Sequence, residues 1–361
     1  MNAWSQWSLL SQNIPQRGRL EQLPKWVICI PIGLQWGWLG LRYRSLGLPA
    51  CANPNITAGG LVGEGKHEYF EQMGPIARAS VAPYILCKVT ASLDPAALAQ
   101  QLAAAQLDFP LVIKPDMGLC GYGVRRVDDF ASLCRDIGLY PLGIDLVIQA
   151  YLSQEGEAGV FYVRRPDQVK GQILGVALRH FPRVIGDGIR TIAELMAEQS
   201  RTAALLTRMD HQCDIDVQRV PAVAEVVRLS TIGSTRVGSC YTDGAAFVTP
   251  ALTEAIDRIA QDMPQFYFGR FDLRFDNLAA LQAGRDLKIM EVNGAGSEAI
   301  DAWDPQHSLW TGFKMILNKQ AILFEIADAC RQRGYQVVSL RKILRLNRQQ
   351  QRLIDQYPPS N

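Results

Sequence analysis

The sequence predicts a mixed α/β protein, and three patterns carry that prediction. Two runs, 269–276 and 287–294, alternate apolar and polar side chains on either side of a polar turn, which is typical of adjacent strands. A continuous apolar run at 109–115 indicates a buried strand. Thr249 and Pro250 precede a helical stretch, where Pro is favoured because the first turn needs no backbone donor. Strands and helices are therefore both expected.

Composition sets the class of protein. The chain has 361 residues, enough for two or three packed subdomains, and 48% hydrophobic and 20% charged residues are ordinary for a globular protein. A formal net charge of +2 gives no electrostatic reason to expect nucleic-acid binding. The eight cysteines are scattered without a CxxC pair, which indicates reduced thiols and a cytoplasmic location.

The two alternating runs bring oxygen donors together. Asp272 lies on the same strand face as Arg270, and Glu291 on the same face as Asn293, because side chains two apart point the same way. If the strands are neighbours, these groups converge. Hard oxygen donors without His or Cys favour Mg²⁺, with Mn²⁺ as an alternative. An ordinary hairpin with exposed charges is the other interpretation.

A glycine-rich segment follows the buried strand 109–115, which ends on Lys114 and Pro115. Gly118, Gly121 and Gly123 let backbone amides approach an anion, and Lys114 adds a point charge for phosphate. The segment is neither a Walker A loop nor a Rossmann GxGxxG motif. A glycine-rich hairpin without a ligand is the alternative.

These segments resemble the ATP-grasp ligases, the superfamily of D-alanine–D-alanine ligase and glutathione synthetase. Arg270-x-Asp272 followed by Glu291-x-Asn293 is similar to their metal-binding end, and residues 186–195 are similar to a Gly-Asp-Gly-x-x-Thr-Ile-x-Glu-Leu segment of cyanophycin synthetase and bifunctional glutathione synthetase. The resemblance covers roughly residues 66 to 300 and implies two α/β lobes that grip ATP, after a short divergent N-terminal region.

The resemblance also implies site residues. Phosphates would be neutralised by Lys66, Lys114 and Arg179 and covered by the glycine-rich loop. The hinge at Gln149, Ala150, Tyr151 and Leu152 would contact adenine, although Gln149 stands where many relatives have an acidic residue. Glu157, or alternatively Glu155, would bind the ribose. The metal ligands would be Asp272, Glu291 and Asn293.

Catalysis and substrate binding complete the implied site. Arg270 and the amides of the 294–297 loop would stabilise the tetrahedral stage of acyl transfer. Arg228 and Arg236 would bind a substrate anion, since a guanidinium suits carboxylate or phosphate. The implied substrate-binding set also includes Gly294, Gly296 and Ser297, and the catalytic set Arg179, Arg228 and Arg270.

The expected function is an ATP-dependent ligase that phosphorylates a carboxylate and joins it to an amine or amino acid, releasing ADP and phosphate. A second expectation is a mycosporine-type ATP-grasp enzyme that phosphorylates an enol oxygen of a small ring compound before condensing it with an amino acid such as glycine. A third, from another class, is a membrane-associated protein that binds nucleotide without catalysis.

Four regions are expected: 1–65 with a Trp-rich segment, 66–148 as the first lobe, 149–325 as the second, and 326–361 as a basic C-terminal helix. The 26–44 segment favours a strand plus helix packed on the body, with peripheral membrane contact as the alternative interpretation. A helix is expected over 66–78, and a homodimer fits the family.

Overall fold

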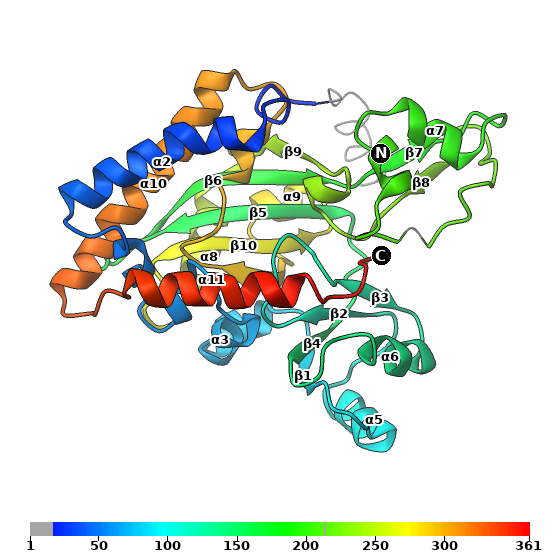
Figure 1. Ribbon diagram of the computed structural model, residues 1–361, viewed down its shortest axis with the longest axis horizontal. Coiled ribbons are helices and arrows are strands. Elements are labelled where there is room, and N and C mark those ends of the chain that lie inside the picture. The colour runs from blue at the N-terminus through cyan, green and yellow to red at the C-terminus, as the bar shows by residue number, and fades with distance from the viewer. Residues whose placement is uncertain (1–16, 213) are drawn as a thin grey trace.

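The computed structural model describes residues 17–212 and 214–361, and it confirms a mixed α/β fold (Figure 1). Residues 1–16 of the expected N-terminal region lie outside the described chain, as does Cys213. The other seven cysteines are free thiols.

A five-stranded antiparallel sheet forms the larger body. Its order is β11-β10-β5-β6-β9, and the strands β10 and β11 are adjacent as predicted. The polar turn between them contains a short helix, α9, which Asn277 caps with its side-chain oxygen. The element bounds are β5 Gly156–Val163, β6 Gln172–His180, β9 Cys240–Asp243, β10 Phe268–Phe275, α9 Leu278–Gln282 and β11 Lys288–Asn293.

Helices cover both faces of this sheet. On one face, α8 (Pro250–Gln261) packs Leu252 and Ile256 against Phe271. On the other face, α2 (Lys25–Arg42) and α10 (Leu309–Gln332) enclose a second core around Phe324. Successive side chains of a strand point to opposite faces of the sheet and so enter the two cores in turn. Every residue of β5 is therefore buried.

A smaller four-stranded sheet, of order β1-β4-β2-β3, lies beside the first. Its core packs on two helices whose first turns are capped by Asp94 and Asp129. The elements are β1 Tyr84–Lys88, α5 Pro95–Ala104, β2 Leu111–Pro115, β3 Arg125–Val127, α6 Phe130–Ile137 and β4 Asp145–Ala150. The apolar segments at 109–115 and 146–152 are therefore strands.

The remaining elements are short or peripheral, and α11 lies across the front of the molecule in Figure 1. They are α3 Lys66–Glu71, α4 Pro75–Ser80, β7 Arg183–Ile185, α7 Ile192–Glu198, β8 Val226–Arg228, α11 Leu340–Ile354, and the 3₁₀ turns Leu48–Cys51, Thr57–Gly60, Ala203–Thr207, Thr235–Val237, Ala245–Phe247 and Ile300–Trp303. β7 and β8 form a separate two-stranded sheet.

Three local predictions were wrong. The helix expected over 66–78 is two helices, because Pro75 removes a donor and disfavours helical geometry at Gly74. The 26–44 segment is one helix rather than a strand plus helix, and Pro31 lies within it. The C-terminal helix is interrupted, since α10 ends at Gln332 and α11 begins at Leu340.

Candidate functional site

Asp272 is the centre of the candidate site. It lies directly opposite Glu291 in the register of β10 and β11, and Arg270 lies opposite Asn293. Opposed side chains in such a ladder have Cβ atoms about 5 Å apart. The Asn293 amide nitrogen donates to an Asp272 carboxylate oxygen at 3.1 Å. The convergence expected from the alternating runs is therefore present.

Two arginines neutralise Asp272 inside the protein. Arg270 donates to its carboxylate at 2.6 and 3.0 Å, and Arg179 on β6 forms an ion pair at 2.8 Å. Burial alone would raise the pKa of Asp272, but the two guanidinium groups outweigh burial and hold it below its ordinary value. Asp272 is therefore a buried anion whose charge is fully compensated.

The arginine network extends to Glu157 on β5. Glu157 pairs with Arg179 at 3.0 Å and with Arg274 at 3.0 Å, and its side chain is buried. Burial opposes the charge of Arg179, yet Asp272 and Glu157 together raise its pKa above the ordinary value. Both Glu157 carboxylate oxygens therefore have arginine partners in this structure. A ribose hydroxyl that donated to Glu157 would bind a carboxylate that is already paired with Arg179 and Arg274.

Two glycines make room for this network. A Cβ at Gly159, the β5 partner of Asp272, would lie 2.9 Å from the Arg270 side chain. A Cβ at Gly233 would lie 2.3 Å from a Glu157 oxygen. A Cβ at either position would force a neighbouring charged side chain to shift, so glycine at both positions lets the charged groups approach one another.

Two lysines from outside the larger sheet approach strand β11. Lys66, at the start of α3, lies 3.3 Å from Glu291. Lys114, at the end of β2, donates to Gln149 at 2.6 Å and to the Met290 carbonyl at 2.8 Å. Burial lowers the pKa of Lys114 to about 8, although Glu291 and Asp272 partly offset that effect. Lys114 therefore lies beside the carboxylate strand, as the resemblance implies.

The glycine-rich loop lies over Lys66. A Cβ at Gly118 would stand 2.9 Å from the Lys66 amine, and Gly121 and Gly123 have positive φ angles that favour glycine. The loop is held from outside by Gln350, which donates to the Gly118 carbonyl at 3.1 Å, and by Tyr357, which donates to the Met117 carbonyl at 2.7 Å.

The hinge is a plain strand end in this structure. Gln149 accepts from Lys114 and donates to the Ala82 carbonyl at 3.0 Å, so both ends of its amide are occupied. The Ala150 and Tyr151 amides donate to the carbonyls of Pro83 and Pro110, and Leu152 is half-buried. The adenine contacts remain a prediction.

Two of the expected substrate groups have other partners. Arg236 donates to the backbone of the glycine-rich loop, at Cys120 and Gly121, and pairs with Asp210 at 2.9 Å. Arg228 stacks on the Phe181 ring at 3.4 Å and pairs with Glu155 at 3.4 Å. Arg236 is thus a loop anchor, while Arg228 is separated from Asp272 by the Arg274–Glu157–Arg179 chain.

The 294–297 loop does not offer the free amides that were expected. The Ala295 and Gly296 amides donate to the carbonyls of Gly59 and Gly60, and the Ser297 amide donates to Gly294. The first two bonds dock the loop on the N-terminal region, and the third lies within the loop. An oxyanion would therefore rely on Arg270 rather than on these three amides.

Sequence reasoning missed Glu64. One of its carboxylate oxygens is buried without a hydrogen-bond partner among the described residues, and burial raises its pKa to about 7. Its charge interacts with Lys66 and Glu291. Its place between Gly63 and Gly65, just before a predicted helix start, was the only available signal.

The donor set fits a hard cation in type. Asp272, Glu291 and Asn293 supply oxygens from two paired strands, as Mg²⁺ prefers. Within the described residues no group of three or more His, Cys, Asp or Glu side chains could hold a metal ion. The set at this site has two carboxylates, and its third donor is the Asn293 amide. A bound cation would take over the partners that Lys66 and the arginines now have.

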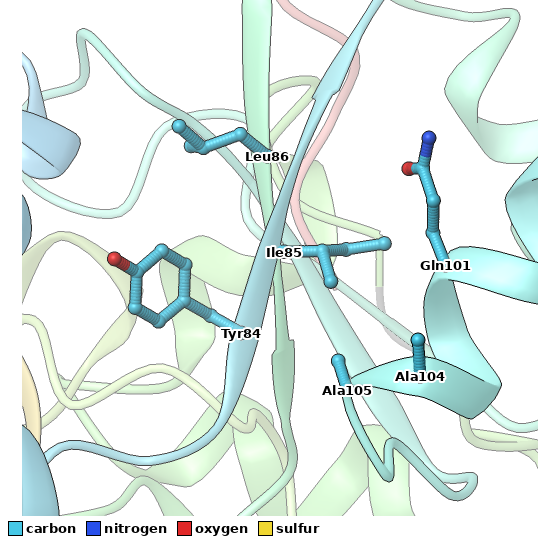
Figure 2. Close-up of a pocket in the computed structure, with 6 residues that line it drawn as sticks. All are labelled: Tyr84, Ile85, Leu86, Gln101, Ala104 and Ala105. Atoms are coloured by element: carbon cyan, nitrogen blue, oxygen red, sulfur yellow. The ribbon is translucent and has the colours of Figure 1, made fainter.

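The two cavities described for this structure lie away from these residues. One, of about 550 Å³, lies between the edge strand β1 and α5, where Ile85 points towards Gln101 and Ala105 while Tyr84 and Leu86 point to the other side of the strand (Figure 2). The other, of about 360 Å³, includes Ile56 and Tyr335.

Comparison with known proteins gives structural similarity only. No protein-family model matches the chain, and neither does any curated protein. A bifunctional glutathione synthetase from Pasteurella multocida is similar at 15% identity and TM-score 0.36, covering 76% of this chain. The chain spans 38% of the length of that protein.

Two ligases of known structure are similar at the same low level. D-alanine–D-alanine ligase from Bacillus anthracis has 13% identity and TM-score 0.42, over 78% of this chain and 72% of that one. VanG D-Ala:D-Ser ligase from Enterococcus faecalis has 14% identity and TM-score 0.41, over 74% and 64%.

Proposed function

We propose that the protein is an ATP-dependent carbon–nitrogen ligase that forms ADP and phosphate. One observation carries the proposal: a lysine from helix α3 and a lysine from strand β2 both lie against β11, the strand that carries Glu291. The Lys66 amine lies 3.3 Å from the Glu291 carboxylate, and the Lys114 amine donates to the Met290 backbone carbonyl at 2.8 Å. Two lysines, a glycine-rich loop and paired carboxylates are the parts that phosphoryl transfer from a metal-bound triphosphate needs.

The residues would divide the work by charge. Lys66, Lys114 and Arg179 would neutralise the triphosphate, and the glycine-rich loop would cover it. Asp272, Glu291 and Asn293 would hold Mg²⁺, which supplies charge compensation on the phosphate oxygens when bound. The ion pair between Lys66 and Glu291 would separate when Lys66 binds the triphosphate and Glu291 binds Mg²⁺.

The proposed reaction has two steps. A carboxylate oxygen of the first substrate attacks the γ-phosphorus, the bond to the bridging oxygen of ADP breaks, and an acyl phosphate forms. The lone pair of an amine then attacks the acyl carbon, phosphate leaves and the amine proton is lost. Arg270, partly buried beside Asp272, would stabilise the oxyanion of that second step.

The test is acceptor-dependent ADP and phosphate release from Mg-ATP with pooled carboxylic acids and amino acids. Glu291→Gln is the matched inactive variant. Turnover that needs both substrate classes and is lost in the variant supports the proposal. Stabilisation by Mg-ATP without turnover in any pool would instead favour the binding protein of the third expectation.

Hydroxylamine distinguishes the activated group. An acyl phosphate reacts with hydroxylamine to give a hydroxamate, whereas an enol phosphate gives none. Hydroxamate formation with a carboxylate pool therefore favours carboxylate activation. Phosphate release from a cyclic enol without hydroxamate would move the assignment to the mycosporine-type reaction.

A further inference from the structure

Helix α2 carries an apolar stripe that nothing in the described protein covers. Its large hydrophobic side chains recur every three or four residues and are mostly exposed: Trp26 68%, Ile30 51%, Leu34 72%, Trp38 56% and Leu41 80%. Residues at this spacing lie on one side of a helix. We call these five residues the α2 face; it extends about 22 Å along the helix at ~1.5 Å per residue.

The opposite side of α2 is attached to the body. Trp36 packs edge-on against Phe324 of α10 at 5.1 Å, and Leu39 is buried in the same core. The Gln35 amide donates to the Leu317 carbonyl at 2.7 Å. Figure 1 shows α2 beside α10 at the outer edge of the molecule. The α2 face is therefore held outwards by a fixed helix.

The charges on α2 are all positive. The helix contains Lys25 and Arg42, one at each end, and no Asp or Glu between them. Arg44 follows the helix and is exposed. The Arg42 guanidinium lies 5.4 Å from the Trp38 ring. Tryptophans with flanking cations on an apolar helix suit a bilayer interface, where indole rings lie at headgroup level and cations meet anionic lipids.

We infer that the α2 face binds the surface of an anionic phospholipid bilayer, with the helix lying in the plane of the interface. No described helix is both long enough and apolar enough to cross a membrane. A surface position is therefore the one that this face offers. The inference does not depend on the proposed ligase activity.

A second copy of the chain is the competing occupant, and two observations weigh against it. A strip about 22 Å long and ~10 Å wide covers about 220 Å², well below the roughly 800 Å² that each partner of a standard interface buries. In addition, pairing two such helices would bring cations together without an acidic partner on either α2.

The test is sedimentation of the whole protein with vesicles of phosphatidylcholine, alone or mixed with phosphatidylserine. We expect binding to the mixed vesicles that weakens with salt. The triple variant Trp26→Ser/Leu34→Ser/Trp38→Ser should bind at least about tenfold more weakly, since each side chain contributes transfer free energy. Lys25→Glu/Arg42→Glu should lose the preference for phosphatidylserine.

The matched control is a triple serine variant at exposed apolar residues elsewhere, Val169, Ile189 and Met209, which should bind vesicles as the wild type does. Circular dichroism checks that both triple variants fold. Equal vesicle binding by the wild type and the α2 variant would overturn the inference, as would binding that ignores lipid charge.

Substitution of two glycines on α2 distinguishes membrane binding from self-association. A Cβ at Gly33 or Gly37 would meet nothing within 4 Å. Alanine at both positions should leave vesicle binding intact, whereas close packing of two helices through these glycines would be weakened. A dimer in light scattering that Gly33→Ala/Gly37→Ala dissociates, without vesicle binding by the wild type, would assign the face to self-association instead.

Discussion

Asp272 is held by arginines of its own sheet, whereas Lys114 is held by groups from both sheets. The Asp272 partners Arg179 and Arg270 lie on β6 and β10, so the sheet itself fixes their separation. Lys114 on β2 bonds Gln149 of its own sheet and the Met290 carbonyl of the other. The first arrangement is part of the folded core, and the second changes whenever the two sheets shift.

This difference predicts which substitutions damage stability and which damage activity alone. Substitutions among the arginines and carboxylates around Asp272 should lower both stability and activity. Substitution of Lys114 should mainly weaken nucleotide binding.

The largest expected effect is that of Asp272→Ala. It would remove a proposed metal ligand, leave Arg270 without a carboxylate partner and leave Arg179 with Glu157 alone, and breaking such a buried pair costs about 3–5 kcal/mol of unfolding free energy. We expect loss of acceptor-dependent phosphate release together with a lower Tm. Full activity in Asp272→Ala would contradict the metal assignment, and an unchanged Tm would contradict the structural role.

Glu291→Gln should separate the two measurements. Its side chain is one-third exposed and pairs only with Lys66 among the described ion pairs. We expect activity to fall by about 10²-fold or more while the unfolding free energy changes by less than about 1 kcal/mol. Calorimetry and phosphate release on the same preparation provide the comparison, and a large loss of stability would count against it.

Lys114 should make ATP binding depend on pH. The free protein loses the Lys114 proton near pH 8, because burial lowers the pKa from its usual 10.5. Anion binding needs the protonated lysine, so affinity should fall as pH rises through 8, by up to about tenfold per unit. Lys114→Met should bind ATP weakly with no such slope; a slope that persists in the variant would refute the assignment.

Gly233→Ala tests the close packing around Glu157. The added methyl would lie 2.3 Å from Oε1 of Glu157, the oxygen that pairs with Arg179, while Arg274 holds the other oxygen of the same carboxylate. We expect a loss of about 1–3 kcal/mol, measured by denaturant unfolding. Gly37→Ala, with open space around it, is the control and should not destabilise the protein.

Tyr357→Phe should have the smallest effect. It removes one hydrogen bond of 2.7 Å to the glycine-rich loop, a loss of about 1 kcal/mol. We expect KM for ATP to rise by a few-fold with kcat nearly unchanged. A general loss of stability without a change in KM would show that Tyr357 has no role in positioning the loop.

The strands of the site could be predicted from the sequence because they obey the two-residue alternation. The β10 and β11 runs predicted the right neighbours and the convergence of Asp272 with Glu291 and Asn293. The approach of Lys114 to that strand followed from the family resemblance alone, since no local pattern specifies a contact between residues 176 positions apart.

The missed features depend on tertiary context. Arg236 was expected at a substrate but anchors the glycine-rich loop, and nothing local reveals the backbone that a long side chain will meet. The apolar stripe of α2 was obscured by Pro31 and three glycines, which argue against one continuous helix. Glu64 gives no periodic signal because it lies in a loop.

The order of strands in the larger sheet has a consequence for synthesis. Val163 on β5 pairs with Phe268 on β10, so β5 must wait for a partner made long after it, whereas β1 to β4 are all complete by Ala150. Long-range pairing of this kind slows folding and leaves strand edges exposed. We therefore expect the smaller sheet to form on the ribosome first, and the nascent larger sheet to be the stage most in need of chaperones.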